Sequence, residues 1–188
     1  MNRRIVVLGT LAVLPLLQGC FPLAVTGMGA ATLMATDRRT AGTYIEDETI
    51  EWKAVARLRE FTPRGVHANP TSFNRRVLLT GEAPTEEMKK QVEDAVRGVE
   101  NVRDVVNELR VAGASSFASR GNDALITSNV KARMVNNGKF SPSHVKVLTE
   151  ANTVYLMGLL TQAEGDAAVE IARTTQGEIG RASCRERV

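Results

Sequence analysis

The chain has 188 residues, of which 43% are hydrophobic, 24% charged and 4% aromatic, and it contains only two cysteines. This composition excludes wholesale disorder, a collagen-like fibre and a disulfide scaffold. The formal charge of +3 comes from the two ends, since Arg3 and Arg4 open the chain and residues 180–188 hold three arginines. The body between them is close to neutral, which argues against a nucleic-acid-binding protein.

Residues 1–19 have the features of a secretory signal peptide. The basic start is followed by the mostly apolar segment Ile5–Leu17, which is shorter than the roughly 18–20 apolar residues of a membrane-spanning helix. Leu17-Gln18-Gly19-Cys20 comes next and resembles the lipobox of bacterial lipoproteins. This resemblance implies cleavage before Cys20 and its acylation, palmitate being one such acyl group. The alternative is an uncleaved helix with a chance cysteine.

The residue after the lipobox indicates the destination. In Gram-negative lipoproteins, aspartate at this position tends to retain the protein in the inner membrane, whereas this chain has Phe21. The resemblance therefore implies transfer to the outer membrane. We expect residues 20–46 to form a lipidated tether, because Val25–Ala35 is rich in Gly, Ala, Met and Thr.

The body of the chain contains two copies of one sequence pattern, and corresponding residues of the two copies are a nearly constant number of residues apart. Asp47 corresponds to Asp123, and Val77-Leu-Leu-Thr-Gly81 corresponds to Val154-Tyr-Leu-Met-Gly158. An offset of this length is long enough for each copy to be a small domain. We therefore expect a first domain over 47–111, a linker of small residues over 112–122, and a second domain over 123–179.

Each copy predicts an α+β domain that begins with a helix and places Asp47 or Asp123 at the helix N-cap. The first helix of each copy has apolar residues at helical spacing: Ile50, Ala54 and Leu58, then Ile126, Val130 and Met134. Two strands follow in each copy: Val66–Thr71 and Val77–Gly81, then Val145–Thr149 and Val154–Leu160. A second helix of copy one carries a further apolar stripe: Met88, Val92, Ala95, Val96 and Val99. We expect two helices packed on one face of a three-stranded mixed sheet.

The two copies differ in their last strand. In copy one this strand is predicted from its apolar residues: Val102, Val105, Val106, Leu109 and Val111. The matching residues of copy two, Arg181–Arg187, show no apolar alternation. We expect this strand to be missing and residues 180–188 to be a non-native tail, such as a frameshift or cloning scar; a divergent native tail is the alternative. We assign no function to Cys184.

The pattern of copy one is similar to that of the BON domain. It consists of Val77-Leu-Leu-Thr-Gly81, a helix, and then Gly98-Val99 and Asn101-Val102-Arg-Asp-Val105-Val-Asn107-Glu-Leu109. Two such domains behind a lipobox resemble BON-domain lipoproteins of the outer membrane. The resemblance implies a lipid-anchored protein that faces the periplasm and supports outer-membrane integrity. It also implies that the second BON domain associates with anionic phospholipid.

The first helix of copy two has a stripe of residues on the side opposite its predicted core. Apolar residues beside basic ones suit a membrane interface, because the former insert and the latter meet phosphate. The predicted phospholipid-binding residues are Leu125, Ser128, Lys131, Ala132, Arg133 and Val135. The alternative is that Leu125 and Val135 contact copy one or the linker.

Trp52 is the only tryptophan and lies on the corresponding stripe of copy one. We expect it at the interface between the two domains, with a second membrane contact as the alternative.

Nothing in the sequence predicts catalysis, a cofactor or a metal. His67 and His144 occupy equivalent positions of the two copies, and neither has a cysteine or a paired acid at ligand spacing. We interpret both as surface histidines. The sequence has no G-x-S-x-G, P-loop or H-E-x-x-H motif. It therefore favours a non-enzymatic protein; the rival hypothesis is an adaptor for outer-membrane assembly proteins, with lipid as its tether only.

Overall fold

The computed structural model describes residues 37–61, 65–113, 115–175 and 182–184. The residues from Thr36 to Val188 belong to one compact unit. Cys20, with the predicted signal peptide and most of the predicted tether, lies outside the described residues. In the part of the chain that is described, no helix combines the length and apolarity needed to cross a bilayer.

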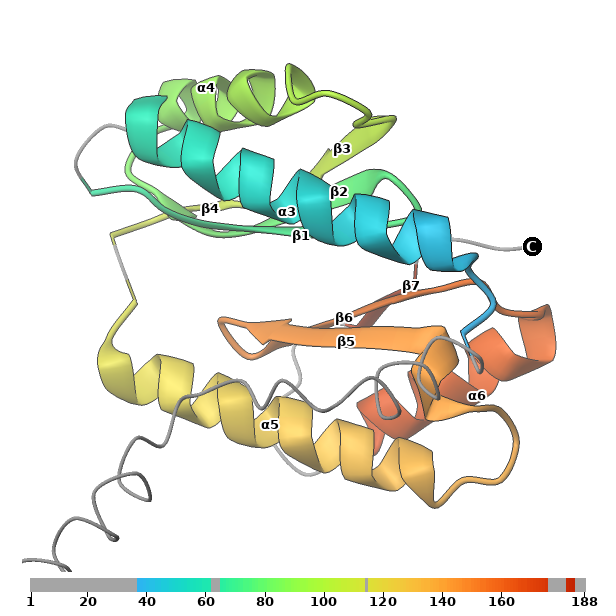
Figure 1. Ribbon diagram of the computed structural model, residues 1–188. Coiled ribbons are helices and arrows are strands. Elements are labelled where there is room, and N and C mark those ends of the chain that lie inside the picture. The colour runs from blue at the N-terminus through green and yellow to red at the C-terminus, as the bar shows by residue number, and fades with distance from the viewer. Residues whose placement is uncertain (1–36, 62–64, 114, 176–181, 185–188) are drawn as a thin grey trace, which may run out of the picture. The chain divides into compact units, whose positions relative to one another are not determined.

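The first copy is an α+β domain with a mixed sheet, as predicted, but the sheet has four strands in place of three, because the predicted last strand is divided in two. Its elements are α3 (Ala41–Phe61), β1 (His67–Phe73), β2 (Arg76–Ala83), α4 (Glu86–Arg97), β3 (Asp104–Asn107) and β4 (Arg110–Val111). Strands β1 and β2 form an antiparallel hairpin, and β3 and β4 both pair with β2 in parallel. Helices α3 and α4 lie on one face of this sheet (Figure 1).

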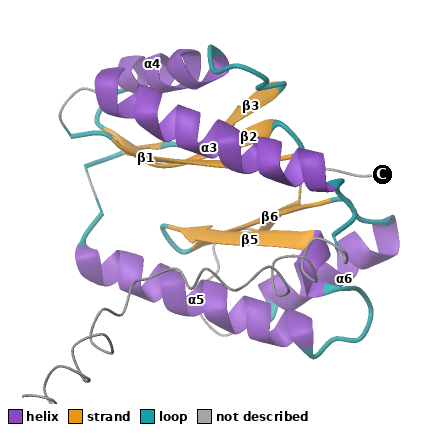
Figure 2. Ribbon diagram, in the orientation of Figure 1, coloured by secondary structure: helices purple, strands orange, loops and turns teal. Residues whose placement is uncertain are grey.

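The second copy repeats this plan. Its elements are α5 (Phe117–Val135), the 3-10 turn η2 (Pro142–His144), β5 (Val145–Glu150), β6 (Thr153–Gly158), α6 (Gln162–Arg173) and β7 (Ala182–Cys184). Strands β5 and β6 form the hairpin, and α5 and α6 lie on one face of the sheet (Figure 2). The stripes predicted for the first helix of each copy are buried. In the second helix of copy one, Val92, Val96 and Val99 are buried, whereas Met88 and Ala95 are only partly buried.

The sheet of the second copy differs from the expectation of a missing last strand. Strand β7 pairs with β6 in parallel, with Ala182 opposite Val154 and Cys184 opposite Leu156. A parallel ladder consists of backbone hydrogen bonds, which any non-proline residue can supply. The lack of apolar alternation therefore did not prevent pairing, although β7 is only three residues long.

Both first helices begin earlier than predicted. Helix α3 starts at Ala41, inside the predicted tether, and α5 starts at Phe117, inside the predicted linker. The N-cap of α5 is Ser116, whose side chain accepts a hydrogen bond from the backbone N–H of Ser119. Asp47 and Asp123 therefore lie within their helices and are not N-caps.

These two aspartates instead hold the hairpin turn of their own copy. Both are buried, and each carboxylate accepts hydrogen bonds from the two backbone N–H groups of the turn, at 2.7–3.0 Å. The four donors all have positive φ angles: Asn74, Arg75, Ala151 and Asn152. Side chains other than glycine are strained in this left-handed conformation, so the buried carboxylate compensates for the strain of the turn.

The segment before α3 contacts both copies. Arg39 donates to Asp47 of copy one at 2.8 Å and lies over the ring of Phe73, 4.1 Å from its centroid. Arg38 forms two hydrogen bonds of 2.7 Å with the carboxylate of Glu164 in copy two. Hydrogen bonds from Arg38, and also from the backbone and hydroxyl of Thr161, lower the pKa of Glu164 to about 2.

A separate apolar cluster joins the two copies. Its buried members are Phe73, Leu78, Tyr155 and Met157. Leu78 and Met157 lie on β2 and β6, one position away from residues that pack under the helices, so they project from the helix-free faces of the two sheets. The central strands are consequently buried on both faces, which agrees with their nearly continuous apolar sequences.

Candidate functional site

The predicted lipid-facing residues of α5 are brought together on one exposed side of the helix. Ile126, Val130 and Met134 are buried on the other side, against the sheet. Leu125 is 65% exposed and Val135 66% exposed. This exposure favours an open surface over the alternative in which the two residues pack against copy one.

Phe117 belongs to the same surface and was missed by the sequence interpretation. It is the first residue of α5 and is 91% exposed. At 100° per residue, Phe117, Ser128 and Val135 lie within about 20° of one line along the helix. We call Phe117, Leu125, Ser128, Ala132 and Val135 the α5 outer face. The sequence feature that indicates a helix start at Phe117 is Ser116, a favourable N-cap residue. The small residues around Ser116 are also typical of a linker, which is why a linker was predicted there.

The two predicted basic residues have different surroundings. Lys131 is exposed on α5. Arg133 is turned toward the end of α6, where it donates to the carbonyl oxygen of Ile171 and to the hydroxyls of Thr174 and Thr175, at 2.9–3.2 Å. A cation is favourable at a helix C-terminus, where carbonyl groups lack helical partners. Lys131 is therefore the better placed of the two to meet a phosphate at the outer face.

An open hollow of about 510 Å³ lies between α5 and the end of α6. Its lining consists of Asn129, Ala132, Arg133, Thr174 and Thr175. Ala132 also belongs to the α5 outer face, so the hollow adjoins that surface. Hydroxyl, amide and guanidinium groups that surround a hollow of this kind can bind a polar or anionic head group.

Trp52 does not take the place expected for it. Trp52 is 75% exposed on α3, and Ile45, about two turns away on the same side of this helix, is another exposed apolar residue. The reason is that α3 packs on its own sheet through Ile50, Ala54 and Leu58, while the two copies contact each other through their sheets. The outer side of α3 is thus left exposed, and a second membrane contact stays open for Trp52.

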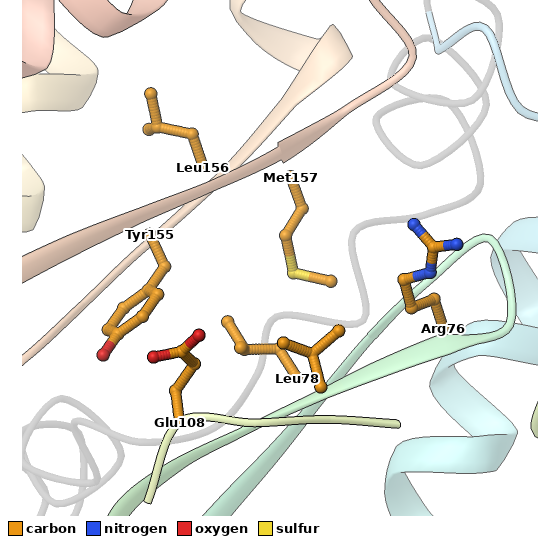
Figure 3. A pocket seen from close by; sticks show the side chains of 7 residues that line it. Arg76, Leu78, Glu108, Tyr155, Leu156 and Met157 are labelled. Carbon is orange, nitrogen blue, oxygen red and sulfur yellow. The ribbon is translucent and has the colours of Figure 1, made fainter. Parts of the chain in front are cut away.

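The interface between the copies is well filled (Figure 3). Figure 3 shows Leu78 and Met157 pointing toward each other and Glu108 beside Tyr155. The cavity lined by these residues measures about 20 Å³, which holds about one water molecule. Polar contacts accompany the apolar ones: Lys146 donates to Glu51 at 2.5 Å, across the two copies.

His67 is not the plain surface histidine that its sequence spacing indicates. It pairs with Glu82 across the β1–β2 hairpin, and its Nδ1 lies 3.3 Å from Oε2 of Glu82. Glu150 of copy two is the third member of this group. Burial raises the pKa of Glu150, and the hydrogen bond that Asn69 donates at 2.9 Å acts in the opposite direction.

A family model and several relatives match the chain. The model is that of the BON domain, and it matches residues 54–113 and 122–178. Outer membrane lipoprotein DolP of Haemophilus influenzae is 39% identical over 164 residues, which are 86% of this chain and 84% of that protein. Neither the family model nor this relative indicates a catalytic family.

Two further relatives are more distant. The 21 kDa hemolysin of Actinobacillus pleuropneumoniae is 33% identical over 143 residues, which cover 75% of this chain and 74% of that protein. Osmotically-inducible protein Y of Escherichia coli is 26% identical over 156 residues, which cover 81% and 78% of the two chains. Each similarity extends across both copies of the repeat.

Proposed function

Because the chain belongs to the BON domain family, we propose that it is a non-enzymatic lipoprotein of the outer membrane that faces the periplasm. In this proposal acylated Cys20 is one anchor, and the α5 outer face binds anionic phospholipid as a second. Together they support outer-membrane integrity. The lipobox and the 39% identity to an outer membrane lipoprotein support the location.

The observation that carries the lipid-binding proposal is the exposure of Phe117, Leu125 and Val135 on one helix face. Full burial of each such side chain contributes about 1.5–3 kcal/mol. An exposed lysine or arginine near an anionic surface contributes about 1 kcal/mol. The apolar contribution is thus the larger one, so added salt is expected to weaken binding without abolishing it.

Charge favours α5 over α3 as the membrane-facing helix. The sequence of α5 contains three basic residues and one acidic residue, Asp123, which is buried. Helix α3 contains five acidic residues, of which Asp47 is buried, and three basic residues. An anionic lipid surface therefore attracts the net positive charge of α5, whereas it repels the net negative charge of α3.

Two anchors on one molecule reinforce each other. Once Cys20 is inserted in the bilayer, α5 samples the same membrane at a high effective concentration, so even weak contacts become populated. A weak second contact that prefers anionic lipid would let the protein select membrane regions, which an acyl chain alone does not do.

The test is co-sedimentation of the chain from Phe21 onward with anionic and zwitterionic vesicles at two salt concentrations. Leu125→Glu is expected to lower affinity for anionic vesicles about tenfold or more, because it removes an apolar contact and adds repulsion. Trp52→Glu is the matched control, being an exposed apolar residue on the corresponding helix of copy one. Unchanged binding by Leu125→Glu would refute this lipid face, and weakened binding by Trp52→Glu would add copy one to it.

A second candidate function, an adaptor for outer-membrane assembly proteins, is favoured by Ile45 and Trp52. These exposed apolar side chains lie on an acidic helix, which suits a basic protein surface better than an anionic membrane. Crosslinking from a photoreactive residue at position 52 to one defined envelope protein would support the adaptor. Loss of localisation in Leu125→Glu alone would support lipid binding.

A further inference from the structure

A histidine and two glutamates meet where the two copies contact each other. His67 opens β1, Glu82 lies near the end of β2, and Glu150 ends β5. Each offers one ligand atom, and the three atoms all lie within 4.8 Å of one another. Glu82 is 3% exposed and Glu150 7% exposed. We propose that these three residues form a site for one zinc ion, which would link copy one to copy two.

The backbone directs the three side chains to this place. His67 and Glu82 are directly opposed in the antiparallel hairpin, so their side chains project from the same face of the sheet. Glu82 lies an even number of residues from Leu78, and Glu150 from Leu148, so both acids share the face that carries the apolar cluster between the copies. The site is thus a polar extension of that interface.

Two atoms of the group lack hydrogen-bond partners among the described residues. They are Nδ1 of His67 and Oε2 of Glu82, and both atoms are fully buried although they lie 3.3 Å apart. Buried polar atoms of this kind are nearly always paired, because otherwise their desolvation is not compensated. A histidine nitrogen and a carboxylate oxygen that are buried this close together without a hydrogen bond can both serve as ligands of one cation.

The charges of the group also favour a bound cation. Glu82 and Glu150 are both acidic, both buried and within reach of each other. Two carboxylates in such a site repel each other when ionised. A divalent cation between them removes the repulsion and replaces the water that burial has taken away.

The donor set selects zinc over calcium and magnesium. Calcium and magnesium prefer oxygen ligands alone, whereas zinc binds imidazole nitrogen and carboxylate oxygen at about 2.0–2.2 Å in tetrahedral geometry. These bond lengths place two ligand atoms roughly 3.3–3.6 Å apart, which agrees with the 3.3 Å between His67 and Glu82. Glu150 would approach by side-chain rotation, and water would fill the fourth position.

The second copy provides a built-in comparison. His144 occupies the position that His67 has in copy one, but the residue opposite it is Leu159, because Val145 is opposite Gly158. The residue of copy one that corresponds to Glu150 is Phe73. Copy two therefore offers an equivalent histidine without the acids, and the proposed site occurs once within the described part of the chain.

The experiment is a zinc titration of the full chain, purified without a histidine tag, stripped of metal and held in detergent. A Cys184→Ser background excludes this cysteine as a zinc ligand. Isothermal titration is expected to give one zinc per chain. At free zinc one hundred times the dissociation constant, the melting temperature is expected to rise by about 5–10 °C.

Variants separate the site from adventitious binding. Glu82→Gln, His67→Asn and Glu150→Gln are each expected to weaken zinc binding tenfold or more, while the matched control His144→Asn binds as the parent does. Far-UV circular dichroism without metal checks that each variant is folded. Cobalt(II) gives a second readout, since its visible absorption reports tetrahedral coordination and should disappear with Glu82→Gln.

Three results would overturn the proposal. No stoichiometric zinc binding by the folded parent protein would exclude the site. Equal binding by the parent and Glu82→Gln would place the metal elsewhere. Retained binding in Glu150→Gln would confine the metal to copy one and exclude a link between the copies.

Discussion

Replacement of Asp123 by alanine tests how the hairpin of the second copy is held. The carboxylate accepts the backbone N–H groups of Ala151 and Asn152 at 3.0 and 2.8 Å. Hydrogen bonds to a charged partner contribute about 1.5–3 kcal/mol each, so the loss of both should lower the free energy of unfolding by about 3–6 kcal/mol. For a protein of this size the melting temperature should fall by roughly 6–24 °C.

Urea denaturation followed by circular dichroism measures this change on the chain from Phe21 onward. Asp47→Ala should be more destabilising still, because Asp47 also accepts from Ser72 and Arg39, both at 2.8 Å. Asp94→Ala, an exposed aspartate on α4, is the control and should change stability by less than about 0.5 kcal/mol. A loss below about 1 kcal/mol for Asp123→Ala, or a smaller loss for Asp47→Ala, would refute the reasoning.

Two further predictions concern a close backbone contact and an ion pair. Gly81→Ala should destabilise the first copy by at least about 2 kcal/mol, because φ is +116° and an added Cβ would lie 2.1 Å from the carbonyl oxygen of His67; Gly113→Ala, where a Cβ meets nothing within 4 Å, is the control in the same melts. The lowered pKa of Glu164 means that its hydrogen bonds with Arg38 and Thr161 stabilise the fold at pH values above the ordinary pKa of 4.5 and that this stabilisation is lost as the pH falls through about 2. Melting temperatures between pH 5 and pH 2 should therefore fall less steeply in Glu164→Gln than in the parent, and identical slopes would contradict this assignment.

Local periodicity was sufficient to predict the cores of both domains. Ile50, Ala54 and Leu58 repeat every fourth residue, and all three are buried on the sheet-facing side of α3 as expected. Helical spacing is a property of a few consecutive turns, so it is readable without knowledge of the rest of the fold. Because the sequence pattern repeats, the same reasoning predicted the buried helix residues of copy two.

Contacts between distant segments were not readable in the same way. An aspartate before an apolar stripe looks like an N-cap, but the partners of Asp47 are Asn74 and Arg75, beyond the next strand. His67, Glu82 and Glu150 are brought together by one hairpin and by the contact between the copies. Neither set of contacts corresponds to a fixed spacing in the sequence. The absence of an acid at ligand spacing from His67 therefore did not exclude an acid close to His67 in the folded protein.

The burial of both sheet faces limits where a large partner can bind. One face of each sheet lies under its helices, and the other contributes to the cluster that contains Leu78 and Met157. A membrane or a protein partner must therefore use a strand edge, a loop or the outer side of a helix. An edge offers backbone hydrogen bonds, which suit an extended peptide but not a lipid surface.

Among the helices, α5 combines exposed apolar residues with a basic sequence, while α3 combines Trp52 with an acidic one. The same fold in two copies thus presents two surfaces of opposite charge, and in the proposed lipid contact it is this charge that selects α5 over α3, while the apolar residues supply most of the affinity.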